Sequence, residues 1–235
     1  LIKKVLNKKI NNILIVNEKK RFLKITNYEQ IRDDSNFKSV CIAGLGHIGM
    51  PLMAHLLKKK EIITAFDNNK KKIKYISNLK LNFFEPGLSP LIRSHLVNKR
   101  IRLVNNINKV NSNIYIVCIG QDVTNNKIKS DNLKNCLMSI SKKLYKGNLV
   151  IIRGTTQVGF CRKIAKSILE KNSGLKAGKD FFLSHMPERI IEGNALEELE
   201  NLPQLVSGYS NKCLNEALKF SNVFFKNSIG LKSLE

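Results

Sequence analysis

The sequence predicts a doubly wound α/β domain, with a mostly parallel sheet and helices on both faces, preceded by a small β-β-α appendage. From residue 38 onward, short β-branched runs alternate with stretches of helical periodicity, which is the pattern of βαβ units. Several of these runs are continuously apolar, as strands buried on both faces of a parallel sheet are. A chain of 235 residues with 43% hydrophobic content can also bury one good-sized core. We therefore assign 38–235 to this domain and 1–37 to the appendage.

Strands and helices are expected to alternate along the main domain. The predicted strands are Ser39–Ala43, Ile62–Phe66, Ile101–Val104, Ile114–Ile119, Leu149–Arg153, Phe181–Ser184 and Gln204–Ser207. The predicted helices are Ile48–Lys60, Lys70–Asn78, Leu88–Val97, Leu133–Tyr145, Gly159–Lys171 and Lys212–Phe225. Asp131 is the expected N-cap of the fourth helix, because a side-chain oxygen at that position accepts hydrogen bonds from unpaired amides of the first turn.

The appendage has a different pattern. Ile13–Val16 and Arg21–Thr26 are predicted strands around a turn at Asn17–Lys20, and a short helix is expected near Tyr28–Arg32. This β-β-α segment resembles the tail half of a CBS repeat. The alternative is an ordinary linker that contains a hairpin.

The net charge of +23 raises the hypothesis of nucleic-acid binding, because clustered lysines neutralise phosphates. The lysines are nevertheless spread over the whole chain, and runs such as Lys58–Lys60 and Lys70–Lys72 fall in amphipathic helices. We therefore favour solvated helix faces that attract anionic cofactors and substrates, and we expect no nucleic-acid partner.

Other classes of protein are disfavoured by the same composition. No apolar run approaches the roughly 18–20 residues of a membrane span, so no membrane partner is expected. The five cysteines include no CxxC pair and no cluster with histidines at metal-ligand spacing. Reduced thiols, a cytoplasmic location and the absence of a metal site are the expectations that follow.

A glycine-rich loop follows the first strand of the main domain. Gly44, Gly46 and Gly49 form a GxGxxG pattern that opens a helix, and Asp67 ends the next strand, close to the usual spacing of about 20 residues. The three glycines allow a tight turn, close approach of a pyrophosphate and close packing of helix on strand. A carboxylate at Asp67 accepts hydrogen bonds from the adenosine ribose and repels a 2′-phosphate. The sequence therefore predicts a Rossmann-type domain that binds NAD rather than NADP.

Five segments, the first of which contains this glycine loop, occur in an order typical of one family. They are GLGHIGMPL at 44–52, NFFEPGL at 82–88, GTTQVG at 154–159, PERIIEG at 187–193 with ALEEL at 195–199, and PQLVSG at 203–208. In this order the chain resembles the UDP-glucose/UDP-N-acetylmannosamine dehydrogenase family, the nucleotide-sugar 6-dehydrogenases. PER stands where UDP-glucose enzymes usually have PEF, which indicates the branch that oxidises UDP-N-acetyl-hexosamines such as UDP-N-acetylmannosamine.

The resemblance implies roles around the cofactor. His47 and Ile48 would give backbone contacts to the NAD phosphates, and Asp67 would contact the ribose. Lys72 would be a basic contact on the adenosine side, and Glu192 would lie near the nicotinamide. As an alternative, Lys72 is one solvated lysine among many.

The resemblance also implies a substrate side, with a UDP-sugar as the substrate. Thr155 would lie by the nicotinamide ribose and the active-site water, which Glu188 would help to position or activate. Arg189 and Ile190 would touch the nucleotide sugar. The plainer alternatives are that the Thr155 hydroxyl bonds its own turn and that Glu188 caps one.

The chain departs from the family pattern at several places. Gln121 replaces a threonine that would contact the cofactor, Arg153-Gly154 stands where many members have Glu-Ser, and Cys161 stands where threonine is common. The family oxidises a C6 alcohol to a carboxylate through a thioester on a cysteine, assisted by a lysine on a long central helix. None of the cysteines here lies in the GxGxGGxC context of that nucleophile.

We therefore interpret the sequence as part of a longer enzyme, starting at Leu1 without an initiator methionine and ending where Ser233-Leu234-Glu235 resembles the start of the central helix. The full-length enzyme would be a homodimer or larger, and the fragment alone would be inactive. Two rivals remain: another β-hydroxyacid-type dehydrogenase, and a non-catalytic module that senses NAD or nucleotides.

Overall fold

The structure is a computed structural model that describes residues 12–16, 22–27, 39–81, 83–124 and 127–234. The chain divides into two compact units, Leu1–Lys38 and Ser39–Glu235. In the first unit, β1 (Asn12–Val16) pairs antiparallel with β2 (Phe22–Asn27), so the predicted pair of strands is confirmed. The helix expected near Tyr28–Arg32 lies outside the described residues, and the likeness to a CBS repeat stays a prediction.

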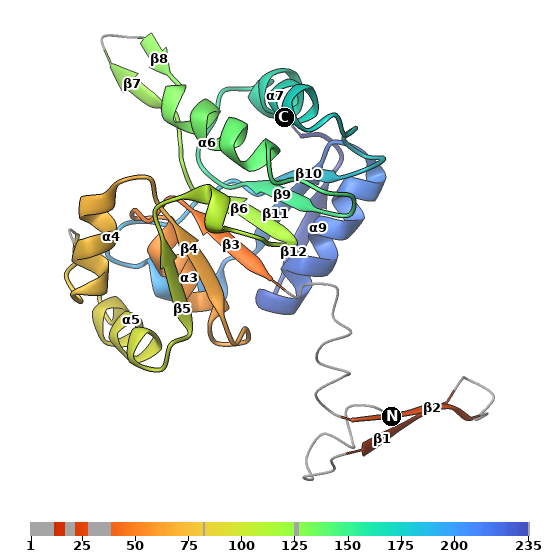
Figure 1. Ribbon diagram of the computed structural model, residues 1–235, viewed down its shortest axis with the longest axis horizontal. Coiled ribbons are helices and arrows are strands. Elements are labelled where there is room, and N and C mark those ends of the chain that lie inside the picture. Colours follow the sequence, from red (N-terminus) through yellow and green to blue (C-terminus); the bar gives the residue numbers. More distant parts are fainter. Residues whose placement is uncertain (1–11, 17–21, 28–38, 82, 125–126, 235) are drawn as a thin grey trace. The chain divides into compact units, whose positions relative to one another are not determined.

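The second unit is built on an eight-stranded sheet in the order β12-β11-β10-β9-β6-β3-β4-β5 (Figure 1). Six neighbouring strands of this sheet are parallel to one another: β5, β4, β3, β6, β9 and β10. At the other edge, β11 is antiparallel to β10, and β12 is parallel to β11. The bounds are β3 Val40–Ala43, β4 Ile63–Phe66, β5 Ile101–Val104, β6 Ile114–Val117, β9 Leu149–Ile152, β10 Phe182–His185, β11 Gln204–Gly208 and β12 Ser228–Leu231. The predicted doubly wound Rossmann-type sheet is confirmed.

The order of the strands creates a topological switch point. The chain moves outward from β3 through β4 to β5, then returns to β6 on the other side of β3. Loops that leave β3 and β6 therefore diverge at the carboxyl edge of the sheet. In open α/β sheets, ligands bind in the crevice that forms at this position.

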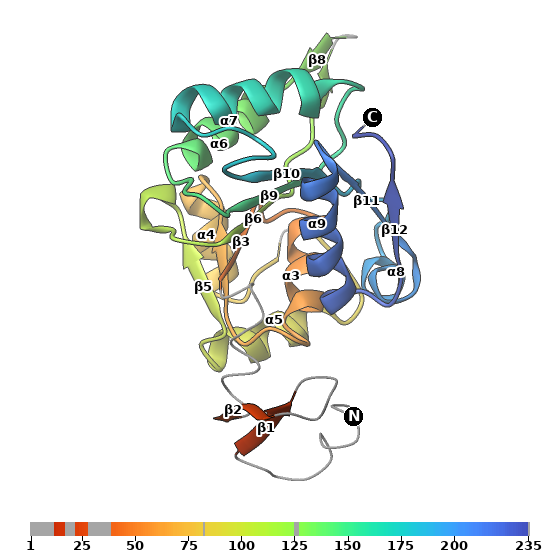
Figure 2. The same cartoon turned by 90° about the vertical axis from the view of Figure 1, so that its right-hand side faces the viewer.

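Helices cover both faces of the sheet (Figure 2). On one face, α6 and α7 pack against each other over alternate residues of the central strands, including Tyr115 and Val117 of β6 and Val150 and Ile152 of β9. On the other face, α3 contacts α5 and α8, while α9 contacts β9, β10 and β11. The bounds are α3 Gly49–Leu56, α4 Lys70–Ser77, α5 Leu88–Val97, α6 Asp131–Ser141, α7 Lys166–Ser173, α8 Ala195–Asn201 and α9 Asn211–Phe224. In the described part of the chain, no helix has the length and apolar character of a membrane span.

Some local predictions are wrong. The N-cap of α6 is Ser130 rather than Asp131, which is the first residue of the helix, and no side chain caps this end. The helix predicted from Gly159 begins as a π-helix, η2 (Phe160–Ala165), and continues as α7. Ser233 and Leu234 lie in no helix.

Other elements were not predicted. Besides the 3-10 turn η1 (Ile107–Lys109), they are α8, β12 and an antiparallel hairpin of β7 (Asp122–Thr124) and β8 (Lys127–Lys129). All three β7 residues are exposed, so this strand has no buried face that would produce an apolar pattern. α8 has only seven residues, too few to repeat the helical period reliably.

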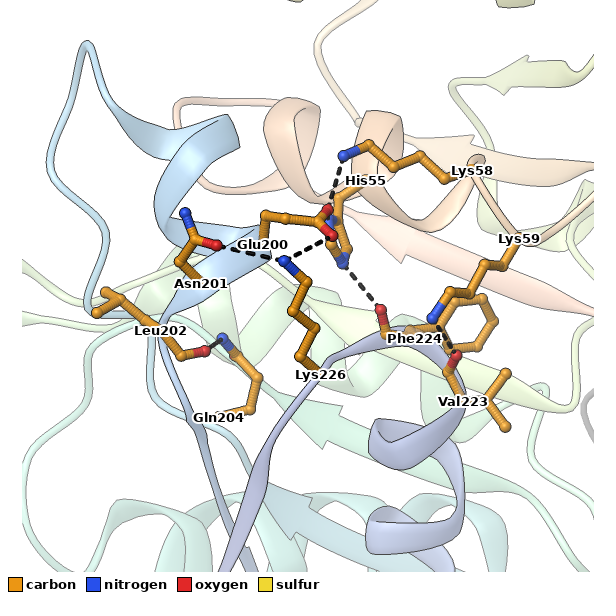
Figure 3. Close-up of polar contacts among 10 residues, drawn as sticks. All are labelled: His55, Lys58, Lys59, Glu200, Asn201, Leu202, Gln204, Val223, Phe224 and Lys226. Carbon is orange, nitrogen blue, oxygen red and sulfur yellow. Dashed lines mark hydrogen bonds and ion pairs between the residues drawn. The ribbon is translucent and has the colours of Figure 1, made fainter.

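A polar cluster joins α3, α8 and the chain after α9 (Figure 3). His55 is buried, its Nε2 lies 3.0 Å from the Phe224 carbonyl oxygen, and its ring stacks on Phe225 at 5.0 Å. Beside it, the Glu200 carboxylate pairs with Lys58 at 2.8 Å and Lys226 at 3.4 Å. The hydrogen bond from Lys58, with that from Lys226, lowers the pKa of Glu200 to about 2.

This cluster predicts how stability depends on pH. Burial is the main cause that lowers the pKa of His55 below its ordinary value near 6.5. The unfolded chain therefore binds a proton at a higher pH than the folded chain does. We expect the free energy of unfolding to fall as pH drops below about 6.5, and the fall to be smaller in His55→Gln.

Urea denaturation at a series of pH values from 7.5 to 5 measures this effect. His95→Gln is a second test, since burial, and after it the nearby Arg100, also lower the pKa of that histidine. Each substitution should remove its own share of the slope. An identical pH profile in His55→Gln and the unsubstituted chain would contradict the assignment.

Candidate functional site

The glycine loop between β3 and α3 has the geometry of a phosphate cradle. Gly44 has a φ of +96°, a backbone conformation that residues with a Cβ rarely adopt. A Cβ at Gly49 would lie 1.9 Å from the Gly44 carbonyl oxygen, whereas a Cβ at Gly46 would meet nothing within 4 Å. No side chain caps the N-terminus of α3 at Ile48. Open space at Gly46 thus borders helix amides suited to an anion.

Asp67, at the end of β4, is bound to this loop. Its Oδ2 accepts hydrogen bonds from the Leu45 amide at 3.0 Å and from the Lys72 ammonium at 2.9 Å, and its Oδ1 accepts from the Asn69 amide at 3.0 Å. The residue is only 6% exposed. The carboxylate is therefore held in place beside the loop, with Lys72 as its neighbour and counter-ion.

A cavity of about 490 Å³ lies over these residues. Its walls come from the glycine loop, the end of β4, the start of α4, the end of β6 and one face of α6. The lining residues are Gly44, Leu45, Gly46, Phe66, Asp67, Asn68, Asn69, Lys72, Cys118, Ile119, Asn132, Asn135, Cys136 and Ser139. The volume falls in the range of small-molecule sites, roughly 300–1,000 Å³.

Two cysteines form part of the cavity wall but are poorly suited to nucleophilic chemistry. Burial raises the pKa of Cys118 and of Cys136 to about 12 each, so both thiols stay protonated near neutral pH. Burial also raises the pKa of Cys41. These side chains supply apolar surface rather than a thiolate.

The loops after β6 and β9 meet beside this cavity. The Gln121 amide donates to the Thr155 carbonyl oxygen at 3.1 Å, and the Gln157 amide donates to Gln121 Oε1 at 2.5 Å. A Cβ at Gly154 would lie 2.3 Å from the Ile119 carbonyl oxygen. Gln121 therefore holds the turn that exposes Thr155, and its side-chain oxygen is occupied within the protein.

Glu188 is a buried carboxylate with a full set of partners. Its Oε2 lies 2.5 Å from both Nε and Nη2 of Arg153, and its Oε1 accepts from the amides of Arg189 at 2.9 Å and Ile190 at 3.2 Å. The two side chains are 1% and 6% exposed. Arg153 also donates to Gln204 Oε1 at 3.0 Å and lies over the Phe225 ring. The arrangement anchors the segment that carries Arg189 and Ile190.

The remaining predicted residues lie on the rims of the loops. His47 Nδ1 is 3.0 Å from Glu192 Oε1, which joins the glycine loop to the segment after β10, and the His47 ring contacts Phe83. Arg189 is exposed and donates to the Pro203 carbonyl oxygen, and Ile190 is half-buried. Arg189 and Glu192 remain at the surface although each has a partner within the protein.

Two residues were not predicted as part of the site. Glu85 is buried and accepts from the amides of Gly193 at 2.9 Å and Ala195 at 2.8 Å, so it joins the 82–88 segment to the start of α8. Arg153, which departs from the family pattern, is the second of these residues. In the sequence, Glu85 could have been recognised as the carboxylate of the EPG segment, and Arg153 as a charge directly after an apolar strand.

The structure thus brings Gly44, Gly46, Asp67 and Lys72 together around one cavity. Thr155, Glu188, Arg189, Ile190 and Glu192 lie on the loops after β9 and β10, outside that lining. Both groups lie beyond the carboxyl ends of parallel strands. Among the described residues there is no group of three or more His, Cys, Asp and Glu that could hold a metal ion.

Several curated proteins are similar in sequence to this chain. UDP-N-acetyl-D-mannosamine dehydrogenase of Campylobacter jejuni is 28% identical over 196 residues, which cover 81% of this chain and 48% of the relative. The enzyme of the same name from Pyrococcus horikoshii is 26% identical over 193 residues, covering 82% and 46%. The chain therefore spans about half the length of the curated relatives it matches.

Solved structures share the fold. A UDP-D-ManNAc dehydrogenase from Pyrococcus horikoshii superposes with a TM-score of 0.79 at 24% identity, covering 83% of this chain and 47% of the other. A GDP-mannose dehydrogenase from Pseudomonas aeruginosa gives 0.76 at 21% identity, covering 83% and 46%. Residues 38–224 match the profile of the UDP-glucose/GDP-mannose dehydrogenase family, NAD binding domain. This chain belongs to that family and carries its NAD-binding domain.

Proposed function

We propose that this chain is the NAD-binding portion of a UDP-N-acetyl-hexosamine 6-dehydrogenase, with UDP-N-acetylmannosamine as the leading substrate. The observation that carries the proposal is the open space at Gly46, placed between the N-terminus of α3 and the buried carboxylate of Asp67. The residues present fit NAD: amides for the pyrophosphate, a carboxylate for the ribose and a cavity of about 490 Å³ for the adenosine side. The names of the relatives support the choice of sugar.

On the cofactor side, the backbone at His47 and Ile48 contacts the phosphates, and Asp67 accepts hydrogen bonds from the ribose hydroxyls. Lys72, already 2.9 Å from Asp67, contacts the adenosine side. Glu192 lies near the nicotinamide, held toward the glycine loop by His47. When bound, NAD supplies the hydride acceptor for the oxidation.

On the substrate side, Thr155 lies by the nicotinamide ribose, while Arg189 and Ile190 contact the nucleotide sugar. Both oxygens of Glu188 are occupied by Arg153 and by backbone amides, which supports a positioning role for this carboxylate over proton abstraction. It fixes the segment beside which the active-site water would lie.

The rest of the reaction belongs to the longer enzyme. Because the chain spans about half of its relatives, we place the nucleophilic cysteine, its helper lysine and the homodimer contacts in the other half. The chain alone would then bind NAD in the cytoplasm without oxidising a UDP-sugar.

Differential scanning fluorimetry with NAD and NADP tests the cofactor assignment. A ligand present at 100 times its Kd stabilises the folded state by about 2.7 kcal/mol. We expect such a stabilisation with NAD and much less with NADP at equal concentration, because Asp67 repels a 2′-phosphate. Asp67→Asn, which keeps the size of the side chain, should reduce the difference between the stabilisation by NAD and the stabilisation by NADP. Equal shifts with the two cofactors in the unsubstituted chain would contradict the role of Asp67.

A further inference from the structure

One wall of the cofactor cavity has no role in the contacts to phosphate and ribose. The glycine loop is assigned to the phosphates and Asp67 to the ribose, but one face of α6 also lines the cavity. The residues of this face are Asn132, Asn135, Cys136 and Ser139. Thr155 and Glu192, assigned to the nicotinamide end, lie outside the lining. The part of NAD that remains for this wall is therefore the adenine base.

The α6 residues of this wall form one stripe along the helix. Positions 132, 135, 136 and 139 are three or four residues apart, so their side chains project from the same side of an α-helix. A different side of α6 is apolar and buried, with Leu133, Leu137 and Ile140 in the core. Packing of these three side chains fixes the helix and so orients the stripe toward the cavity.

Two carboxamides in the stripe are available to a ligand. The side chains of Asn132 and Asn135 are exposed and form no hydrogen bond with any residue that the structure describes. Ser139 differs, because its Oγ already donates to the Asn135 carbonyl oxygen at 2.8 Å. Asparagine is a much poorer helix former than alanine, so the stability of α6 alone does not favour two asparagines at these positions.

The neighbouring lining residues suit the flat faces of a base. Cys136 of the stripe lines the cavity together with Cys118 and Ile119, which follow β6. Burial raises the pKa of both thiols to about 12, so they present uncharged surface. After burial, the charge of Asp67 is the second cause that raises the pKa of Cys136. The stripe therefore lies close to the carboxylate that is assigned to the ribose.

We propose that Asn132 and Asn135 select the base of the cofactor by binding the N6 amino group and N7 of adenine. A carboxamide accepts a hydrogen bond from N6 and donates one to N7 at the same time, as asparagine does when it reads adenine in nucleic acids. Hypoxanthine carries an oxygen in place of the amino group, so the carboxamide oxygen would meet another acceptor. The inference rests on the proposed binding of NAD and adds the residues that distinguish the base.

Isothermal titration with NAD and with nicotinamide hypoxanthine dinucleotide measures this selection. The two ligands differ only in the base, so the contacts to phosphate and ribose contribute equally to both affinities. We expect the unsubstituted chain to bind NAD at least about tenfold more tightly than the hypoxanthine analogue, and Asn132→Ala/Asn135→Ala to bind the two within about twofold of each other. Alanine favours the helix, so this variant should remain folded, which thermal denaturation verifies.

Asn215→Ala/Asn222→Ala is the matched control. Both asparagines are exposed on α9, on the face of the sheet opposite α6 (Figure 2), and neither lines the cofactor cavity. This variant should keep the preference for NAD. Equal affinities for the two dinucleotides in the unsubstituted chain, or an undiminished preference in Asn132→Ala/Asn135→Ala, would overturn the inference and leave NAD binding intact. Failure to bind either dinucleotide would contradict the proposed NAD binding, and the inference with it.

Discussion

Gly49→Ala is expected to destabilise the main domain by about 3 kcal/mol, while Gly46→Ala leaves its stability nearly unchanged. A Cβ at Gly49 would lie 1.9 Å from the Gly44 carbonyl oxygen and 3.0 Å from its carbonyl carbon. Both neighbours are backbone atoms of the loop, so no side chain can move aside. Relief of this clash requires β3 and α3 to separate, which opens a fully buried part of the core. Urea denaturation of the two variants measures the difference.

Gly46→Ala is expected to weaken the binding of NAD although it leaves the stability of the domain nearly unchanged. Since a Cβ at this position meets no protein atom within 4 Å, alanine fits the folded chain, but its methyl group fills the space assigned to the pyrophosphate. We expect NAD affinity to fall by at least about tenfold, or about 1.4 kcal/mol, in a variant with unchanged stability. Unaltered NAD affinity in Gly46→Ala would show that the open space is not the phosphate site.

The strands around this loop could be predicted because each is a continuous apolar run, and every residue of β3, β6 and β9 is buried. Hydrophobic periodicity gives no signal where a strand has no buried face. It could not reveal the exposed β7, nor the switch from π-helix to α-helix at Lys166, since a π-helical segment of six residues is too short to show a period of its own.

The site could be predicted only in part for a similar reason. The glycines and Asp67 follow a fixed local spacing, and the structure places Asp67 against the loop amide at Leu45. The partners of Glu85 and Glu188 are distant in sequence: Glu85 and Gly193 are 108 positions apart, and Arg153 and Glu188 are 35 positions apart. No local pattern shows that such groups meet. An arginine after an apolar strand therefore gives no sign of its partner, although it is the counter-ion of the Glu188 carboxylate.

Arg153→Met is expected to destabilise the domain by about 3–5 kcal/mol, the usual effect of removing one partner of a buried ion pair. Arg153 is 1% exposed and supplies both contacts to Glu188 Oε2, along with the hydrogen bond to Gln204. Its removal leaves a buried carboxylate whose remaining donors are the two backbone amides at Arg189 and Ile190. Urea denaturation at pH 7.5 measures the loss.

The double variant Arg153→Met/Glu188→Met separates a coupled pair from two independent residues. Well-packed apolar replacements of a buried ion pair are often close to neutral, so the double variant should be more stable than Arg153→Met alone, with a coupling energy of about 2 kcal/mol or more. Purely additive losses would contradict the pairing. A recovery of stability supports the role proposed for Glu188. A carboxylate that fixes the 187–193 segment has its charge compensated by Arg153. A carboxylate that takes a proton from water instead needs an oxygen that no protein donor occupies.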